Sequence, residues 1–180
     1  SDRAQSMLDN ASAIARANYA RELSDVGRET TTMRDDLLFY LESMPIDSER
    51  FVYGFGVQVF RRELSEGMIV EVGPDHEIRT VAIVNPHNRP LDQVVTPEMI
   101  REVESGKDAY IARTSDRIVA LTYLDRNTNT YLYAARILDP LLGTQIQRVD
   151  AILADYQALR DRSRTMQLRF NIALLLVSLF

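Results

Sequence analysis

The first forty-four residues contain a single glycine, Gly27, and no proline, and this constrains the fold more than any other feature of the chain. Apolar side chains recur there in steps of three and four, a spacing that predicts an α-helix. At 1.5 Å per residue, a helix over 4–44 is about 60 Å long. Such a helix either packs on a globular core or pairs with another long helix. We expect its first twenty residues to pair, because their apolar stripe is too narrow to fill a core.

A second long helix is predicted at the other end of the chain, over 143–169, with a heptad pattern of its own. It leads without a turn signal into an apolar run, 170–180, which has about half of the roughly 20 residues that a bilayer-spanning helix needs. We interpret this run as the start of a truncated transmembrane helix rather than as a buried core helix. The predicted seam for signalling or dimerisation along the two helices comprises Met7, Ile14, Val26, Met33, Leu37, Val149, Ile152, Tyr156, Leu159 and Met166.

Two shorter helices are predicted between the long ones. Residues 51–59 place their apolar side chains on one helical face but also alternate as a strand would, and of the two we predict a helix, capped by Asp47 or Ser48. Thr96 and Pro97 predict the start of the other short helix, which ends before Gly106.

Five strands are predicted around these helices, separated by turn-forming residues. They cover 68–72, 78–84, 109–114, 117–125 and 130–138. Hairpin connections between neighbouring strands make the sheet antiparallel, so the fold class is α+β. We expect the helices to gather on one face of this five-stranded sheet, with 48–139 as a single α+β core.

Composition excludes several kinds of protein. The net charge of −5, with no basic face in the body of the chain, argues against a nucleic-acid partner. The chain has no cysteine, and its two histidines, His76 and His87, lie in separate loops, so no zinc or other metal site is predicted. No catalytic motif is found, and the paired acids Asp35 and Asp36 suit a solvated helix face. We therefore expect this segment to contain no catalytic residue.

The predicted strands carry candidates for a small-molecule site. A pocket with tyrosine side chains as walls and one or two charged groups is suited to binding an amino acid or another small carboxylate. Tyr123 and Asp125 are expected to share one face of their strand, as are Tyr131 and Tyr133 on the next. The candidate ligand-binding residues are Arg79, Arg113, Tyr123, Asp125, Tyr131 and Tyr133. The alternative is that these tyrosines are ordinary half-buried strand residues and the arginines are solvated.

Two stretches resemble a known family. Residues 51–64, followed by the hairpin 68–84, and the run 159–180 are similar to the N-terminal sensor region of NtrY-type histidine kinases, whose sensors resemble PDC or Cache domains. The resemblance implies a PAS-like antiparallel sheet in an extracytoplasmic sensor domain, 1–169, followed by the truncated transmembrane segment. It also implies an inner-membrane protein whose sensor is periplasmic.

The resemblance further implies a homodimeric kinase in nitrogen regulation that phosphorylates a response regulator. ATP and Mg²⁺ would belong only to the kinase region, and no cofactor is expected in this segment. Four arginines in 160–169 oppose the periplasmic placement, because positive charge before a membrane helix favours the cytoplasmic side. A second hypothesis is a membrane-anchored module without catalytic activity that binds a partner protein.

Overall fold

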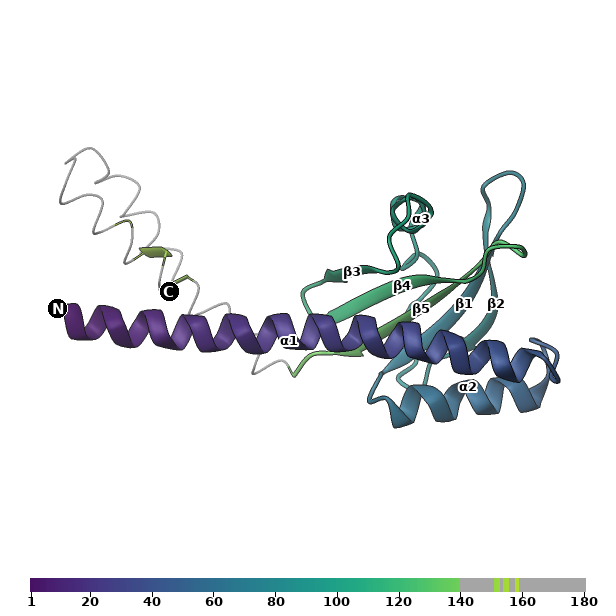
Figure 1. The fold of residues 1–180 in the computed structure, drawn as a ribbon, viewed down its shortest axis with the longest axis horizontal. Coiled ribbons are helices and arrows are strands. Elements are labelled where there is room, and N and C mark those ends of the chain that lie inside the picture. The colour runs from purple at the N-terminus through teal and green to yellow at the C-terminus, as the bar shows by residue number, and fades with distance from the viewer. Residues whose placement is uncertain (140–150, 153, 156–157, 159–180) are drawn as a thin grey trace. The chain divides into compact units, whose positions relative to one another are not determined.

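The computed structural model describes residues 1–139, 151, 152, 154, 155 and 158 (Figure 1). The chain divides into two compact units. One comprises Ser1–Arg21 with the described residues from Asp139 onward, and the other is Glu22–Leu138. The second unit holds the sheet and all the short helices described below.

The predicted long helix is confirmed as α1 (Asp2–Leu41). In its second half one face is apolar and buried, and Thr30 on that face donates its hydroxyl to the carbonyl of Val26 at 2.7 Å. This bond satisfies a polar side chain that is fully buried. The helix ends shortly before Pro45, because proline restricts the residue that precedes it and cannot donate a backbone hydrogen bond.

The ambiguous stretch after Pro45 is a helix, α2 (Glu49–Arg61), as predicted. Of the two proposed caps it is Ser48 that serves, because its side-chain oxygen accepts from the backbone N–H of Phe51 at 3.2 Å. The helical spacing prevails because Phe51, Phe55 and Val59 are then all buried on one face. A hydrogen bond from Gln58 Nε2 to the Tyr40 hydroxyl, 2.8 Å long, joins α2 to α1.

All five predicted strands are present and form one antiparallel sheet in the order β2-β1-β5-β4-β3. Their bounds are Glu66–Val72 (β1), Ile78–Val84 (β2), Tyr110–Arg113 (β3), Arg117–Asp125 (β4) and Thr130–Ile137 (β5). The central strands β1, β5 and β4 are buried along almost their whole length. Both faces of the sheet therefore need covering.

The helices are not gathered on one face, so that prediction is wrong. α1 and α2 cover one face of the sheet, while α3 (Pro97–Glu104) packs against the other. The cap of α3 is as predicted, since the Thr96 side chain accepts from the backbone N–H of Met99 at 3.3 Å. Sequence periodicity identified the elements but not this arrangement, which follows from the apolar side chains on both faces of the sheet.

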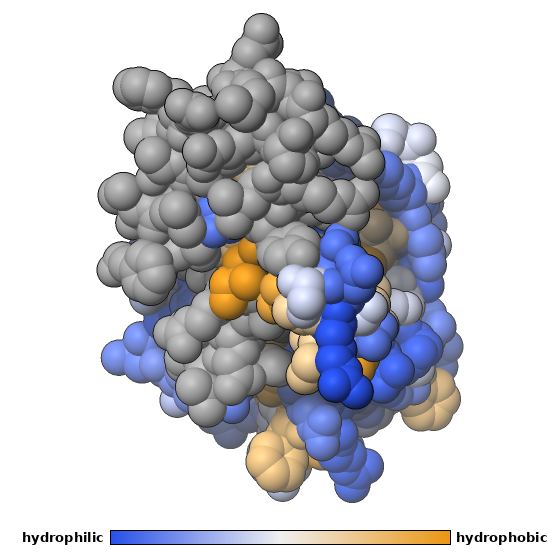
Figure 2. Space-filling view, turned by 90° about the vertical axis from the view of Figure 1, so that its left-hand side faces the viewer, coloured by the Kyte–Doolittle hydropathy of each residue, from blue (hydrophilic) through white to orange (hydrophobic). Residues whose placement is uncertain are grey.

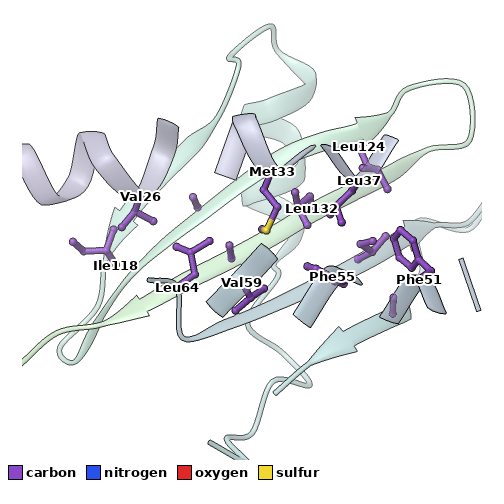
Figure 3. Close-up of a cluster of buried hydrophobic side chains, with 14 of the residues drawn as sticks. Val26, Met33, Leu37, Phe51, Phe55, Val59, Leu64, Ile118, Leu124 and Leu132 are labelled. Carbon is purple, nitrogen blue, oxygen red and sulfur yellow. The ribbon is translucent and has the colours of Figure 1, made fainter. Parts of the chain in front are cut away.

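Two apolar clusters fill the spaces above and below the sheet. The cluster under α1 and α2 contains Met33, Phe55 and Val59 of the helices together with Leu132 of β5 (Figure 3). Gly67 lets the backbone of β1 lie close to the Phe55 side chain of α2, because a Cβ added at this position would lie only 2.9 Å from the Phe55 ring.

The other cluster joins α3 and the loop before it to the opposite face through Met99, Val103 and Leu121. The candidate site described below lies in this second layer.

Within the described residues, no helix has the length and apolar character needed to cross a membrane. The run 170–180, in which a truncated transmembrane helix was predicted, lies outside those residues, as does most of the predicted helix over 143–169.

Candidate ligand-binding site and its buried charge network

An open cavity of about 560 Å³ lies on the α3 side of the sheet. Met99 of α3 and Val119 of β4 give it apolar walls, and Tyr110 of β3 adds an aromatic one. Its polar groups come mainly from the end of β3 and the turn into β4, and from Tyr133 of β5. The lining residues of that turn are Arg113, Thr114, Ser115, Asp116 and Arg117. A cavity with mostly apolar walls and a few converging polar groups is the usual form of a small-molecule site.

A fully buried carboxylate lies behind this cavity. Glu66, at the start of β1, is 0 % exposed. Its Oε2 accepts two hydrogen bonds, one from the Tyr133 hydroxyl and one from Arg117 Nη1, each 2.6 Å long. Arg89 approaches from the loop before α3, with its Nε 3.5 Å from Glu66 Oε1. Two cavity-lining residues are thus held in place by one buried acid.

The strand register explains how these residues meet. Glu66 is paired with Ala135, and Arg117 with Ile137, on either side of β5, so the two side chains flank that strand at the same end of the sheet. Residues that are directly paired across strands share a face. Because Tyr133 lies on the same face of β5, its hydroxyl reaches the carboxylate between the two neighbouring strands.

Charge pairing continues from the buried acid to the rim of the cavity. Arg89 donates from Nη2 to Asp116, and the Thr114 hydroxyl donates to the same carboxylate at 3.1 Å. The hydrogen bond from Arg89 is the main reason that the pKa of Asp116 lies below its usual value. Burial alone would lower the pKa of Arg117, but its interactions with Glu66 outweigh this and raise it, so Arg117 stays charged.

The pKa values of the two tyrosines on β5, Tyr131 and Tyr133, are also raised. Burial, reinforced by the hydrogen bond to Glu66, raises the pKa of the Tyr133 hydroxyl. Burial also raises the pKa of Tyr131 to about 12, with a further contribution from Glu104, to which the Tyr131 hydroxyl donates at 3.1 Å. Both phenols are therefore neutral hydrogen-bond donors at physiological pH.

This shift predicts a dependence of stability on alkaline pH. Because Tyr131 has a higher pKa in the folded chain than the usual value near 10, its contribution is fully present below about pH 10 and is lost as the pH rises toward 12. Urea unfolding at pH 9 and pH 11 should show a smaller loss of stability for Tyr131→Phe than for the unmodified chain. Tyr53→Phe, at an exposed position of α2, is the control and should leave the loss unchanged.

The structure brings two of the six predicted ligand residues, Arg113 and Tyr133, to the cavity. Arg79 instead makes an ion pair with Glu71 across the β1–β2 hairpin at 2.7 Å. Tyr131 lies on the α3 side but bonds to Glu104. These placements leave the role of each residue in ligand binding a prediction.

Tyr123 and Asp125 do not share a face, contrary to expectation. The register of β4 and β5 shifts between them, so that Tyr123 is paired with Tyr131 and Asp125 with Thr130. This irregularity adds a residue to β4 and breaks the strict alternation. The Tyr123 ring then lies against two guanidinium groups, those of Arg34 at 4.7 Å and Arg126 at 4.0 Å.

Sequence reasoning missed Glu66, Arg89 and Arg117, the charged residues of the buried network. Each is charged, and each lies shortly before a predicted strand, at the first position of one, or in a loop, where a solvated side chain is the usual expectation. The strand order and register were needed to bring Glu66 and Arg117, which are 51 residues apart, onto neighbouring sides of β5.

The predicted helix seam is divided between different surroundings. Val26, Met33 and Leu37 are fully buried in the core beneath α1 and α2, whereas Met7 and Ile14 are largely exposed. Ile152 is half-buried. The remaining four predicted positions, Val149, Tyr156, Leu159 and Met166, lie outside the described residues. Met7 and Ile14 are therefore the part of the seam on α1 that is open for pairing with another helix.

No cluster of three or more potential metal-ligating acids or histidines occurs in the part of the chain that the structure describes. His76 lies in the β1–β2 turn with a φ of 62°, and it faces a small hollow beside α3. The side chains that line the cavity offer hydrogen bonding and charge recognition through arginine, carboxylate, hydroxyl and phenol groups.

A helix-flanked antiparallel sheet with an open cavity between the sheet and a short helix defines a domain of the α+β class. The sequence family described as the NtrY N-terminal region matches residues 1–180. The chain belongs to this family, and it is a sensor region of the NtrY type from a two-component sensor kinase. No curated protein and no solved structure shows a match to the chain.

Proposed function

We propose that this region is the extracytoplasmic signal-sensing domain of a membrane-bound, NtrY-like histidine kinase in nitrogen regulation, and that its cavity beneath α3 binds a small molecule carrying a carboxylate. Family membership supports the sensor role. The observation that carries the ligand proposal is the cavity itself, in which Arg113 and Arg117 accompany the hydroxyls of Ser115 and Tyr133. Guanidinium groups bind carboxylates through paired, charge-assisted hydrogen bonds.

The contacts of α1 provide a route from the sheet to the long helix. Arg136 of β5 donates from Nη1 to Glu22 and Asp25 of α1, both at 2.8 Å. Arg62, after α2, makes ion pairs with Glu29 and Asp36 of α1 at 2.8 and 2.5 Å. A ligand that favours one arrangement of the sheet would thereby bias the position of α1.

The proposed output is a shift of the long helices relative to a second protomer. In this proposal the domain is of the PDC or Cache type, lies in the periplasm, and works as a homodimer with Met7 and Ile14 at the helix seam. The C-terminal helix would carry the shift into the inner membrane. The kinase region would use ATP and Mg²⁺ and phosphorylate a response regulator, and no cofactor is assigned to this segment.

A thermal-shift screen of the 180-residue chain against amino acids, small carboxylates and other nitrogen compounds tests the ligand proposal. A ligand at a hundredfold excess over its Kd stabilises the folded chain by about 2.7 kcal/mol. We expect one carboxylate class to raise the melting temperature by several degrees, and Arg113→Met to weaken the binding of that ligand at least tenfold. Titration calorimetry measures the affinity.

Arg79→Met is the matched control for this experiment, because Arg79 is also a strand arginine but pairs with Glu71 away from the cavity. The Arg79→Met variant should bind the ligand with the same affinity as the unmodified chain. If no compound shifts the melting temperature, or if both variants bind equally well, the cavity is not the ligand site.

The second candidate is the interaction module that binds a partner protein and has no small ligand. The observation that favours it is a group of exposed aromatic side chains on α1 and α2. An absence of ligand binding combined with capture of a defined partner by these helices would support this candidate over the first.

A further inference from the structure

Three aromatic side chains project into solvent from the α1–α2 layer. Phe39 of α1 is 68 % exposed, and Tyr53 and Phe60 of α2 are 76 % and 83 % exposed. All three lie on helices whose opposite faces are buried against the sheet. On the side of the molecule shown in Figure 2, most of the coloured residues are hydrophilic. Clustered exposed aromatics of this kind mark interaction surfaces.

Gly56 lies between Tyr53 and Phe60 in sequence and carries an independent sign of close packing. A Cβ added at Gly56 would meet nothing within 4 Å, so nothing described in the chain's own fold requires glycine there. By contrast, a Cβ at Gly54 would lie 3.1 Å from the Tyr40 ring, which explains that glycine. Glycine inside a helix is destabilising, and its usual benefit is that another backbone can approach closely.

These positions fall on one face of α2. Tyr53, Gly56 and Phe60 are separated by three and four residues, the spacing that aligns side chains along a helix. The buried residues Phe51, Phe55 and Val59 fix the other face, so the aromatic face is presented by a rigid element.

We propose that this surface, which we name the α2 face and define by Phe39, Tyr53, Gly56 and Phe60, docks against the same face of a second copy of the chain. A two-fold axis through Gly56 would place this glycine against its own copy, with the aromatic rings on either side. The proposal is independent of the ligand cavity and of the Met7–Ile14 seam.

The charges around the α2 face favour a second copy over a membrane surface. α2 carries Glu49 and Arg50 in its first turn and Arg61 in its last, and Glu42 follows α1. A surface edged by both acidic and basic side chains can be complementary to a second copy of itself, because an acid of one copy can face a base of the other. An anionic membrane surface would instead attract a border that is predominantly basic.

The area is of the right order for a self-interface. A large aromatic side chain buries about 150–250 Å² when it is fully covered. Three such side chains, exposed by 68 to 83 %, supply on the order of half of the approximately 800 Å² per partner that a standard interface buries. The helical surface around them can supply the rest.

Sedimentation equilibrium of the 180-residue chain in a non-ionic detergent tests the proposal through Gly56→Leu. We expect the dimer dissociation constant to rise at least tenfold because the helices can no longer approach. When both chains are diluted until they are monomeric, the melting temperature should not fall, because the space above Gly56 is open and leucine is the better helix former. Ile83→Asp, at a partly exposed apolar site on β2, is the control and should leave dimerisation unchanged.

A double variant, Met7→Asp with Ile14→Asp, separates this proposal from the helix seam. If this variant abolishes dimerisation while Gly56→Leu has no effect, the α2 face is not an interface and the seam stands. The opposite result supports the α2 face and removes the seam.

Cysteine cross-linking gives a second readout, because the chain contains no cysteine of its own. A disulfide forms only when two Cα atoms lie within about 7 Å. Gly56→Cys should form a covalent dimer under mild oxidation, and Asp75→Cys, in the exposed β1–β2 turn, should not. A Gly56→Cys chain that stays monomeric, or cross-links no faster than Asp75→Cys, overturns the proposal.

Discussion

Replacing Glu66 with glutamine is expected to lower the free energy of unfolding by about 3 kcal/mol, since removing one partner of a buried ion pair typically costs 3–5 kcal/mol. The glutamine side chain fits the same space, but Arg117 loses the carboxylate that it contacts at 2.6 Å. Arg89 loses the same charge at its 3.5 Å contact. Urea unfolding monitored by circular dichroism measures the change.

The matched control for Glu66→Gln is Arg79→Met in the same sheet. Arg79 is 67 % exposed, and its pair with Glu71 is open to water. Exposed ion pairs contribute at most about 1 kcal/mol, so this variant should be nearly as stable as the unmodified chain. Equal losses for the two variants would mean that the buried network contributes no more than a surface pair.

The loss from Glu66→Gln should also reach the candidate site. Tyr133 and Arg117 both line the cavity and both bond to Glu66 Oε2. Removing the charge frees Arg117 to turn. The affinity of the variant for a carboxylate ligand should therefore differ from that of the unmodified chain, even where the variant is fully folded. Calorimetric titration at a temperature well below the unfolding transition separates this effect from the loss of stability.

Replacing Arg136 with methionine is expected to cost about 3 kcal/mol and to loosen the second half of α1. The Arg136 guanidinium donates to the carbonyls of Arg62 and Glu63, at 3.0 and 2.8 Å, as well as to Glu22 and Asp25. Hydrogen bonds that involve a charged group contribute about 1.5–3 kcal/mol each, and they are not additive. Methionine keeps the apolar stem but leaves these acceptors without the cation.

Hydrogen exchange gives the specific readout for Arg136→Met, because amides over 22–41 should exchange faster if the link to β5 holds α1 in place. Arg28→Met is the control. Arg28 contacts the same Asp25 at 2.5 Å but is 67 % exposed, so its loss should change stability by less than about 0.5 kcal/mol. Unchanged exchange in α1 of Arg136→Met would contradict the proposed route from the sheet to the helix.

The secondary structure was largely predictable, because it depends on local patterns. The proline-free start of the chain produced α1, and the caps at Ser48 and Thr96 began α2 and α3 where they were expected. The β1–β2 turn follows the predicted glycine and proline signals. Each of these features is fixed by residues only a few positions apart, so sequence spacing is sufficient to find it.

The candidate site was predictable only in part. Arg113 and Tyr133 were identified because arginine and tyrosine on strands suit a carboxylate ligand. Tyr123 and Asp125 were placed on one face because strict alternation was assumed, and a register shift between them was not visible in the sequence. Glu66 carried no signal, since a charged residue beside a strand usually lies in solvent.

The sequence by itself determined α1, α2 and α3, the strands, the antiparallel hairpins and the resemblance to the NtrY N-terminal region, because these depend on local spacing and composition. Only the tertiary structure decided that α3 covers the opposite face from α1 and α2, and that Glu66, Arg117 and Tyr133 meet behind the cavity. The physical reason is that these contacts depend on strand order and register. Those are set by burying both faces of the sheet at once, a condition that no short stretch of sequence contains.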